Sequence, residues 1–233
     1  MIKQIKKDIQ QKANPEKAVI LARFFKTGKG EYGEGDIFIG VTIPNIRTIA
    51  KKYANIPLNT IQQLLNNPVH ELRVTGVIIL VNKFKKATEA EREKIYNFYI
   101  KNFKNINNWD LVDLSCHHIV GEFLLDKQEK RKILYEWAKS NDLWTKRIAV
   151  ISTFDFIRNK QFDECLHIAE LLLNDKHDLI HKAVGWMLRE TGKRNQEVEE
   201  KFLRKHYKKM PRTMLRYSIE KFDKNKKAFY MKK

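Results

Sequence analysis

Residues 66–104, NNPVHELRVTGVIILVNKFKKATEAEREKIYNFYIKNFK, decide the fold class. The stretch contains two predicted helices, 69–86 and 89–104, separated by a tight turn. Asn66, Asn67 and Pro68 form the turn before the first helix. Thr88 and Glu91 have the capping-box spacing that marks the start of the second. Two helices joined so closely are expected to pack as an antiparallel pair.

The same rhythm continues along the chain. Asn14 is a candidate N-cap and Pro15 a favoured first helical residue. Later segments carry apolar residues at positions i, i+3, i+4 and i+7, and no segment alternates convincingly with period two. The predicted helices are 2–12, 15–26, 44–54, 58–66, 69–86, 89–104, 109–125, 128–139, 143–158, 162–173, 177–191, 196–209 and 211–222.

A helix pair every 35 to 45 residues or so is typical of HEAT-like solenoids. We therefore predict an all-α superhelix of antiparallel helix pairs, forming a single domain over residues 1–233 with a concave cleft. Sequence similarity between the pairs is weak, so a globular helical bundle is the alternative. A concave basic face would be able to hold a nucleic-acid duplex.

The 233-residue chain has a net charge of +18, which attracts polyanions such as DNA, RNA or an anionic membrane. A Lys-rich surface that only reflects biased codon usage is the alternative. No apolar run approaches the roughly eighteen residues needed to span a bilayer, and no signal peptide is apparent. Cys116 and Cys165 are far apart and lack metal-ligand spacing, so we expect a reducing compartment, the cytoplasm, and no metal or organic cofactor.

Two segments depart from the helical pattern. Residues 27–43 hold five of the nine glycines, and GKGEYG there lacks the strand-then-helix context of a dinucleotide site. This segment is predicted to be a flexible loop that approaches phosphates, or a plain linker. Residues 201–233 hold thirteen Lys or Arg and two acidic residues, which indicates a basic arm or helix contacting phosphates, or a solvated tail.

The run NNWDLVD places Trp109 and Asp113 four residues apart. On a helix these side chains would share one face, roughly 6 Å apart. A carboxylate facing a bound polyanion is repelled by it. Asp113 is therefore either paired within the structure or needed for chemistry that develops positive charge.

Two further segments carry candidate binding residues. Trp186 lies in LIHKAVGWMLRE with Lys182 and Arg189 on the same helical face, as on a polyanion-binding surface or, more plainly, in an amphipathic core. Lys146 and Arg147 lie near the predicted N-terminus of 143–158, which favours anions over cations. A phosphate bound between them would explain this placement. An ordinary ion pair is the alternative.

NWDLVD, LWTKRIAV and HKAVGWMLRE together resemble the bacterial DNA alkylation repair family of the AlkD type, the HEAT-like alkylpurine DNA glycosylases. ARFFKTGKGEYGEGD and PRTMLRYSIEKF also resemble that family, so the similarity covers essentially the whole chain. It implies a helical superhelix that holds duplex DNA in its concave cleft. It also implies hydrolysis of the N-glycosidic bond of cationic N3- or N7-alkylated purines.

The resemblance assigns roles to individual residues. It implies that Asp113 is the catalytic carboxylate, that Trp109 and Trp186 flank the deoxyribose, and that Arg147 contacts the DNA backbone. It further implies DNA contacts for Arg47 and Arg189. We also predict Lys146, Lys182 and Arg216 to be DNA-binding residues. It suggests that the base is not flipped. Phe24 stands where well-known members carry a tyrosine, and Asn108 where some carry a tryptophan.

We therefore expect a monomeric, monofunctional glycosylase in the bacterial cytoplasm, associated with the nucleoid, whose partner is double-stranded DNA containing alkylated purines. No lysine clearly occupies a Schiff-base position. A non-catalytic binder of unusual or damaged DNA is the first alternative. A HEAT scaffold that binds protein is the second.

Overall fold

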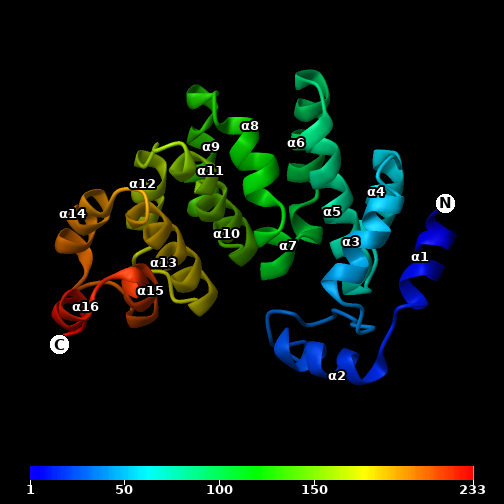
Figure 1. The fold of residues 1–233 in the computed structure, drawn as a ribbon, viewed down its shortest axis with the longest axis horizontal. Helices are drawn as coiled ribbons and strands as arrows, with labels where there is room; N and C mark the ends of the chain where they lie inside the picture. The colour runs from blue at the N-terminus through cyan, green and yellow to red at the C-terminus, as the bar shows by residue number, and fades with distance from the viewer. Residues whose placement is uncertain (233) are drawn as a thin grey trace. The chain divides into compact units, whose positions relative to one another are not determined.

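The structure, a computed structural model, describes residues 1–232 (Figure 1). Within that range the elements are helical, apart from one isolated parallel bridge between Ile37 and Val69. This confirms the predicted all-α class. The chain divides into two compact units, Met1–Ser115 and a second that begins at Cys116. Each is described by itself, and the single-domain assignment stays a prediction.

The first unit is organised around helix α5. Its elements are α1 (Ile2–Gln10), α2 (Pro15–Phe24), α3 (Ile43–Lys52), α4 (Leu58–Leu65), α5 (His70–Lys86), α6 (Glu89–Lys101), the 3-10 turn η1 (Phe103–Asn105) and α7 (Trp109–Asp113). Helix α5 packs against its neighbours α4 and α6 and also against α3, α1 and α7. Thirteen of its seventeen residues are buried, as expected for a helix covered on all sides.

The second unit is organised around α13. Its elements are the π-helical turn η2 (His117–Gly121), α8 (Glu122–Leu124), η3 (Gln128–Lys130), α9 (Lys132–Ala138), α10 (Leu143–Ser152), α11 (Phe154–Arg158), α12 (Asp163–Leu171), α13 (Asp178–Gly192), α14 (Gln196–His206), α15 (Arg212–Ser218), η4 (Ile219–Lys221) and α16 (Lys224–Met231). Helix α13 packs against α10, α11, α12, α14 and α15.

Local capping residues set several helix starts. The Asn14 side chain accepts a hydrogen bond from the Lys17 amide at 2.9 Å, and Pro15 opens α2. The Glu91 carboxylate accepts from the Thr88 amide at 2.8 Å, so the predicted box forms at the start of α6. These contacts satisfy amides that have no partner inside the helix.

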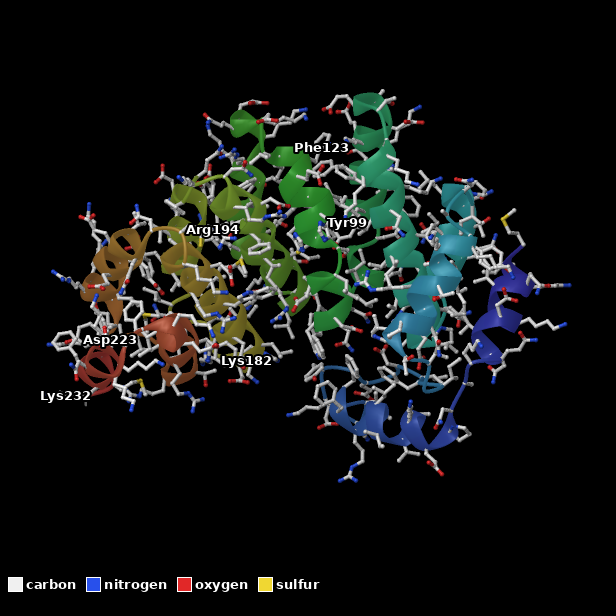
Figure 2. The ribbon with its side chains drawn as sticks, in the orientation of Figure 1. Tyr99, Phe123, Lys182, Arg194, Asp223 and Lys232 are labelled. Atoms are coloured by element: carbon white, nitrogen blue, oxygen red, sulfur yellow. The ribbon has the colours of Figure 1, made fainter. Side chains whose placement is uncertain are left out.

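The predicted helix 109–125 is wrong in its continuity. The chain leaves α7 after Asp113, turns at Leu114 and Ser115, and resumes as η2 and α8. The Ser115 hydroxyl lies 2.6 Å from the carbonyl of Leu111, a back-bond that bends helices. It also hydrogen-bonds the hydroxyl of Tyr99, which α6 directs into the core (Figure 2).

Two other boundaries differ from the prediction. The helix predicted at 143–158 is interrupted at Thr153, whose hydroxyl donates to the Val150 carbonyl at 2.6 Å. The basic C-terminal segment contains a further helix, α16, capped by the Asp223 side chain, labelled in Figure 2. Lys233 lies outside the described residues.

Candidate functional site

Helix α7 carries both Trp109 and Asp113 on one short turn. Trp109 is its first residue and Asp113 its last, and both are half-buried. Both line the same cavity in the first unit, whose volume is about 480 Å³. The i, i+4 spacing therefore places an indole and a carboxylate on the same space, as the sequence predicts.

The rest of that cavity is mostly apolar and comes largely from α2 and the segment after it, although Lys17, His70, Glu71 and Asp110 also line it. Ile20, Leu21 and Phe24 line it from α2, and Phe38 and Val41 from the glycine-rich segment. None of the side chains of α2 is fully buried, and Phe24 is 61% exposed. The Asp113 carboxylate and the Trp109 indole therefore border a mostly apolar cavity.

Two phenylalanines hold the Trp109 indole. The Phe25 ring stacks on it at 4.9 Å with an interplanar angle of 4°, and the Phe24 ring meets it edge-on at 5.9 Å. Such contacts add about 0.5–1.5 kcal/mol beyond the burial of apolar area. Because Phe25 covers one face of the indole, a ligand can stack only on the other.

A buried charge cluster lies behind the indole. The His70 ring contacts Asp36 through Nδ1 at 3.0 Å and Asp110 through Nε2 at 2.8 Å. Arg73 also donates to Asp36, and so does the Asn108 side chain, at 3.1 Å. The His70 side chain is 2% exposed. The cluster joins the first turn of α5 to the glycine-rich segment and to the start of α7.

The cluster shifts the pKa values of His70 and Asp36. Burial alone lowers the pKa of His70, but the hydrogen bonds to Asp110 and Asp36, and their charges, outweigh it and raise the pKa to about 9. Burial raises the pKa of Asp36, yet the His70 hydrogen bond and the charge of Arg73 bring it below its ordinary value. At neutral pH His70 is therefore an imidazolium that donates from both nitrogens.

The second half of the glycine-rich segment is anchored by hydrogen bonds, and the flexibility predicted for residues 27–43 stays a prediction. The Glu71 carboxylate accepts hydrogen bonds from the amides of Ile39, Gly40 and Val41, the closest at 2.7 Å. Gly40 has φ +83°, and a Cβ there would lie 2.0 Å from the Asn14 carbonyl oxygen. The second half of the segment therefore forms part of the cavity wall.

Six of the other predicted site residues lie in the second unit, five of them on α10 and α13. Trp186, on α13, is half-buried, and its ring lies 5.9 Å from that of Phe154. Arg147, on α10, is 5% exposed and donates to the Leu179 carbonyl. Three of the predicted cations form ion pairs, namely Lys146 with Asp175, Lys182 (Figure 2) with Asp178, and Arg189 with Glu220.

Arg47 and Arg216 are the predicted DNA-binding residues most open to solvent. Both are exposed, on α3 and α15 respectively. No hydrogen bond or ion pair is found for either guanidinium among the described residues. Both are thus available to a phosphate without first breaking a contact.

Sequence reasoning missed His70, Asp36 and Phe25. Asp36 and Asp110 lie 34 and 40 residues from His70, so no local spacing reveals their contact. One weak signal existed, since HELR puts three charged or ionisable residues at the start of a helix whose central part is largely apolar. Among residues 1–232, no three His, Cys, Asp or Glu side chains are grouped as metal ligands.

Comparison with known proteins identifies the family. Residues 5–222 match the sequence profile described as "DNA alkylation repair enzyme". The chain belongs to the DNA alkylation repair enzyme family. The membership confirms the resemblance carried by the three sequence motifs. It gives the protein a role in DNA repair and makes DNA its partner.

Solved structures support the family at the level of the fold. A structure described as a predicted DNA alkylation repair enzyme from Enterococcus faecalis is 16% identical, with a TM-score of 0.71 over 91% of this chain and 98% of its own. AlkD2 from Streptococcus mutans is 18% identical, with a TM-score of 0.57 over 95% and 97%. These likenesses confirm the predicted helical-repeat fold.

No curated protein sequence matches the chain. Among residues 1–232, no helix is both long and apolar enough to cross a lipid bilayer.

Proposed function

We propose that this DNA alkylation repair enzyme is a monofunctional glycosylase acting on cationic N3- or N7-alkylated purines in duplex DNA. The observation that carries the proposal is the joint placement of Trp109 and Asp113 on one turn, lining one cavity, in a chain of net charge +18. A basic protein gathers the duplex, and a carboxylate then meets the one part of the substrate that becomes positive.

The chemistry requires little beyond that carboxylate. A purine alkylated at N3 or N7 is already cationic, so it leaves with the electron pair of the C1′–N bond and needs no general acid. The sugar acquires positive charge at C1′, which Asp113 stabilises. Water then forms the C1′–O bond, and the carboxylate orients it and accepts its proton.

The aromatic residues contribute through their faces. The free face of Trp109 attracts the electron-poor C–H edge of the deoxyribose, an interaction related to cation–π attraction and worth about 0.5–2 kcal/mol. We assign the same role to Trp186. The base itself stays outside the protein, which grips sugar and backbone, so flipping is not required.

We assign DNA-backbone contacts to the cations in order of their freedom. Arg47 and Arg216, which are exposed and have no ion-pair partner among the described residues, come first. Lys146, Lys182 and Arg189 would exchange a carboxylate partner for a phosphate. Arg147 acts from a more buried position, where it also holds the Leu179 carbonyl.

Incubation with a duplex containing 7-methylguanine, followed by chromatography of the released base, tests the proposal. Wild-type protein should release the base. Asp113→Asn should bind the duplex as before but release it at least about tenfold more slowly, equivalent to about 1.4 kcal/mol of transition-state stabilisation. Asp126→Asn removes the same charge from an exposed loop position and should leave release unchanged.

Each alternative has its own outcome. Tight binding of damaged duplex without any release by the wild-type protein would establish a non-catalytic DNA binder. Weak binding that hardly changes with salt would indicate a protein-binding scaffold, because phosphate contacts make affinity fall steeply as salt rises.

A further inference from the structure

Helix α7 is too short to hold its own geometry. It has five residues, and an isolated helix becomes stable in water only near 12–15 residues, because the first turn is costly to nucleate. Trp109 and Asp113 occupy its two ends. Their orientation therefore comes from contacts that other elements make with α7.

One set of contacts reaches the backbone of α7. Asp110 accepts from the Leu111 amide at 2.8 Å while its other oxygen meets His70 Nε2 at 2.8 Å. Asn108 accepts from the Trp109 amide at 2.8 Å and donates to Asp36. Asn108, the residue before Trp109, is thus tied to Asp36, and Asp110, the residue after it, is tied to His70, which bridges the two carboxylates.

A second set reaches the indole itself. The His70 ring stacks on Phe38 at 4.5 Å, and Phe38 stacks on Phe25 at 4.8 Å. Phe25 then stacks on Trp109 at 4.9 Å. The His70 ring also meets Phe25 directly, at 5.2 Å. A column of rings therefore runs from the buried imidazolium to the indole, in parallel with the hydrogen-bonded route.

We propose that His70 is a positioning residue, which sets the Trp109 indole through the Phe38–Phe25 column and, through Asp110, the turn that carries Asp113. His70 touches no reacting atom. It acts because it meets Asp36 and Asp110 together and presents a ring to Phe38. A glutamine at this position would keep a hydrogen-bonding group but lose the ring, the charge and the second donor direction.

The activity test rests on the proposed glycosylase function. With His70→Gln, the single-turnover rate of 7-methylguanine release should fall at least tenfold, while the duplex Kd changes less than twofold. In an Asp113→Asn background the same substitution should have little further effect on the rate. A purely structural histidine would instead lower stability and leave the rate constant of the folded protein unchanged.

A matched control is available in the same unit. Asp8 accepts from Lys52 at 2.6 Å and from Tyr53 at 2.8 Å, a polar cluster that joins α1 to α3 and does not involve α7. Asp8→Asn should leave the release rate within twofold of wild type.

A second measurement does not depend on activity. In the free protein, the NMR resonance of the Trp109 indole N–H, assigned with Trp109→Phe, should move in His70→Gln and in Phe38→Leu but not in Asp8→Asn. If His70→Gln does not fold, Asp110→Asn, which breaks the hydrogen-bonded route, and Phe38→Leu, which weakens the ring route, replace it in both measurements.

The outcomes separate the two proposals. A wild-type protein that releases no base overturns the glycosylase function, and the indole resonance then decides the positioning by itself. A folded His70→Gln protein with wild-type release rate and an unmoved resonance overturns the positioning role while leaving the glycosylase intact.

Discussion

The Trp109 indole and the Phe25 ring lie parallel, 4.9 Å apart at 4°, so the residue that would face the substrate is supported from behind by an aromatic plane. Phe25 is buried, whereas its neighbour Phe24 is exposed. This pairing leaves one indole face for a ligand and makes the tilt of that face depend on a residue from another part of the chain.

Replacing Phe25 with leucine keeps apolar volume but removes the stack. We expect base release to slow by roughly three- to tenfold, the equivalent of an aromatic contact of about 0.5–1.5 kcal/mol, with duplex binding retained. Release is measured in single turnover. Phe84→Leu makes the same change in the buried core of α5 and should not slow release. Equal rates for both variants would show that the stack is irrelevant to the reaction.

Arg47 is expected to contribute to the salt dependence of DNA binding. Arg47→Ala should weaken binding to any duplex and reduce the slope of log K against log salt by about one phosphate contact. Lys52, on the same helix α3, already pairs with Asp8 at 2.6 Å, so Lys52→Ala should change the slope less. Fluorescence anisotropy titrations at several salt concentrations provide the comparison, and a larger effect of Lys52→Ala would contradict the assignment.

Alanine substitutions at Gly40 and Gly30 together separate the cost of backbone strain from the cost of steric crowding. Both have positive φ, at +83° and +79°, but an added Cβ meets the Asn14 carbonyl only at Gly40. Gly30→Ala should lower the free energy of unfolding by about 1–2 kcal/mol, the cost of a left-handed residue with a side chain. Gly40→Ala should cost clearly more in urea denaturation. Similar losses would mean that Asn14 moves aside at no cost.

His70 should make the protein less stable as pH rises into the alkaline range. Its pKa is about 9 when folded against 6.5 for an ordinary histidine, so the folded state binds the extra proton between these values. The stabilisation is complete below pH 6.5 and is lost as pH rises through 9, in total about 3 kcal/mol. Urea unfolding from pH 6 to 10 should show a shallower decline for His70→Gln than for wild type; parallel curves would refute the assignment.

Glu199 should contribute a second loss of stability with rising pH, from a different cause. Burial raises the pKa of this α14 carboxyl to about 9, with a contribution from Glu200, and one of its oxygens has no hydrogen-bond partner. The folded state therefore retains a proton that the unfolded state releases near pH 4.5, and stability falls as pH rises from there to 9. Glu199→Gln should gain stability relative to wild type as pH rises.

The pH window distinguishes the two groups. Of these two groups, only Glu199 differs in protonation between the folded and unfolded states at pH 5 to 6, so the stability gain of Glu199→Gln should already grow there. The His70→Gln difference should begin to change only above about pH 6.5. A gain for Glu199→Gln that is independent of pH would show that the carboxyl has the same charge in the folded and unfolded states.

Local sequence rules predicted the parts of this structure that depend on local contacts. Asn14 and Glu91 form the expected caps, and the four-residue spacing of Trp109 and Asp113 brings both to one cavity. The break after Asp113 was not expected, although the back-bond of Ser115 to the preceding turn is itself local. The periodic apolar pattern continued through the break and concealed it.

Long-range partners were beyond such rules. Lys146 and Arg189 were predicted to meet phosphates, and their carboxylate partners Asp175 and Glu220 lie 29 and 31 residues away. The anchoring of the glycine-rich segment depends likewise on Glu71, which lies 30–32 residues from the amides that it holds. The composition of that segment gave no sign of this contact.

The brevity of α7 has an evolutionary consequence. On the roles proposed for Trp109, Asp113 and His70, a homologue could become a pseudoenzyme while its tryptophan and aspartate remain in place, because substitutions at the positions of Asp36, His70 or Asp110 would release the turn that displays them. Sorting homologues by the Trp–Asp pair alone would count such proteins as active. Covariation among these three distant positions is the better mark of a lineage that has kept its chemistry.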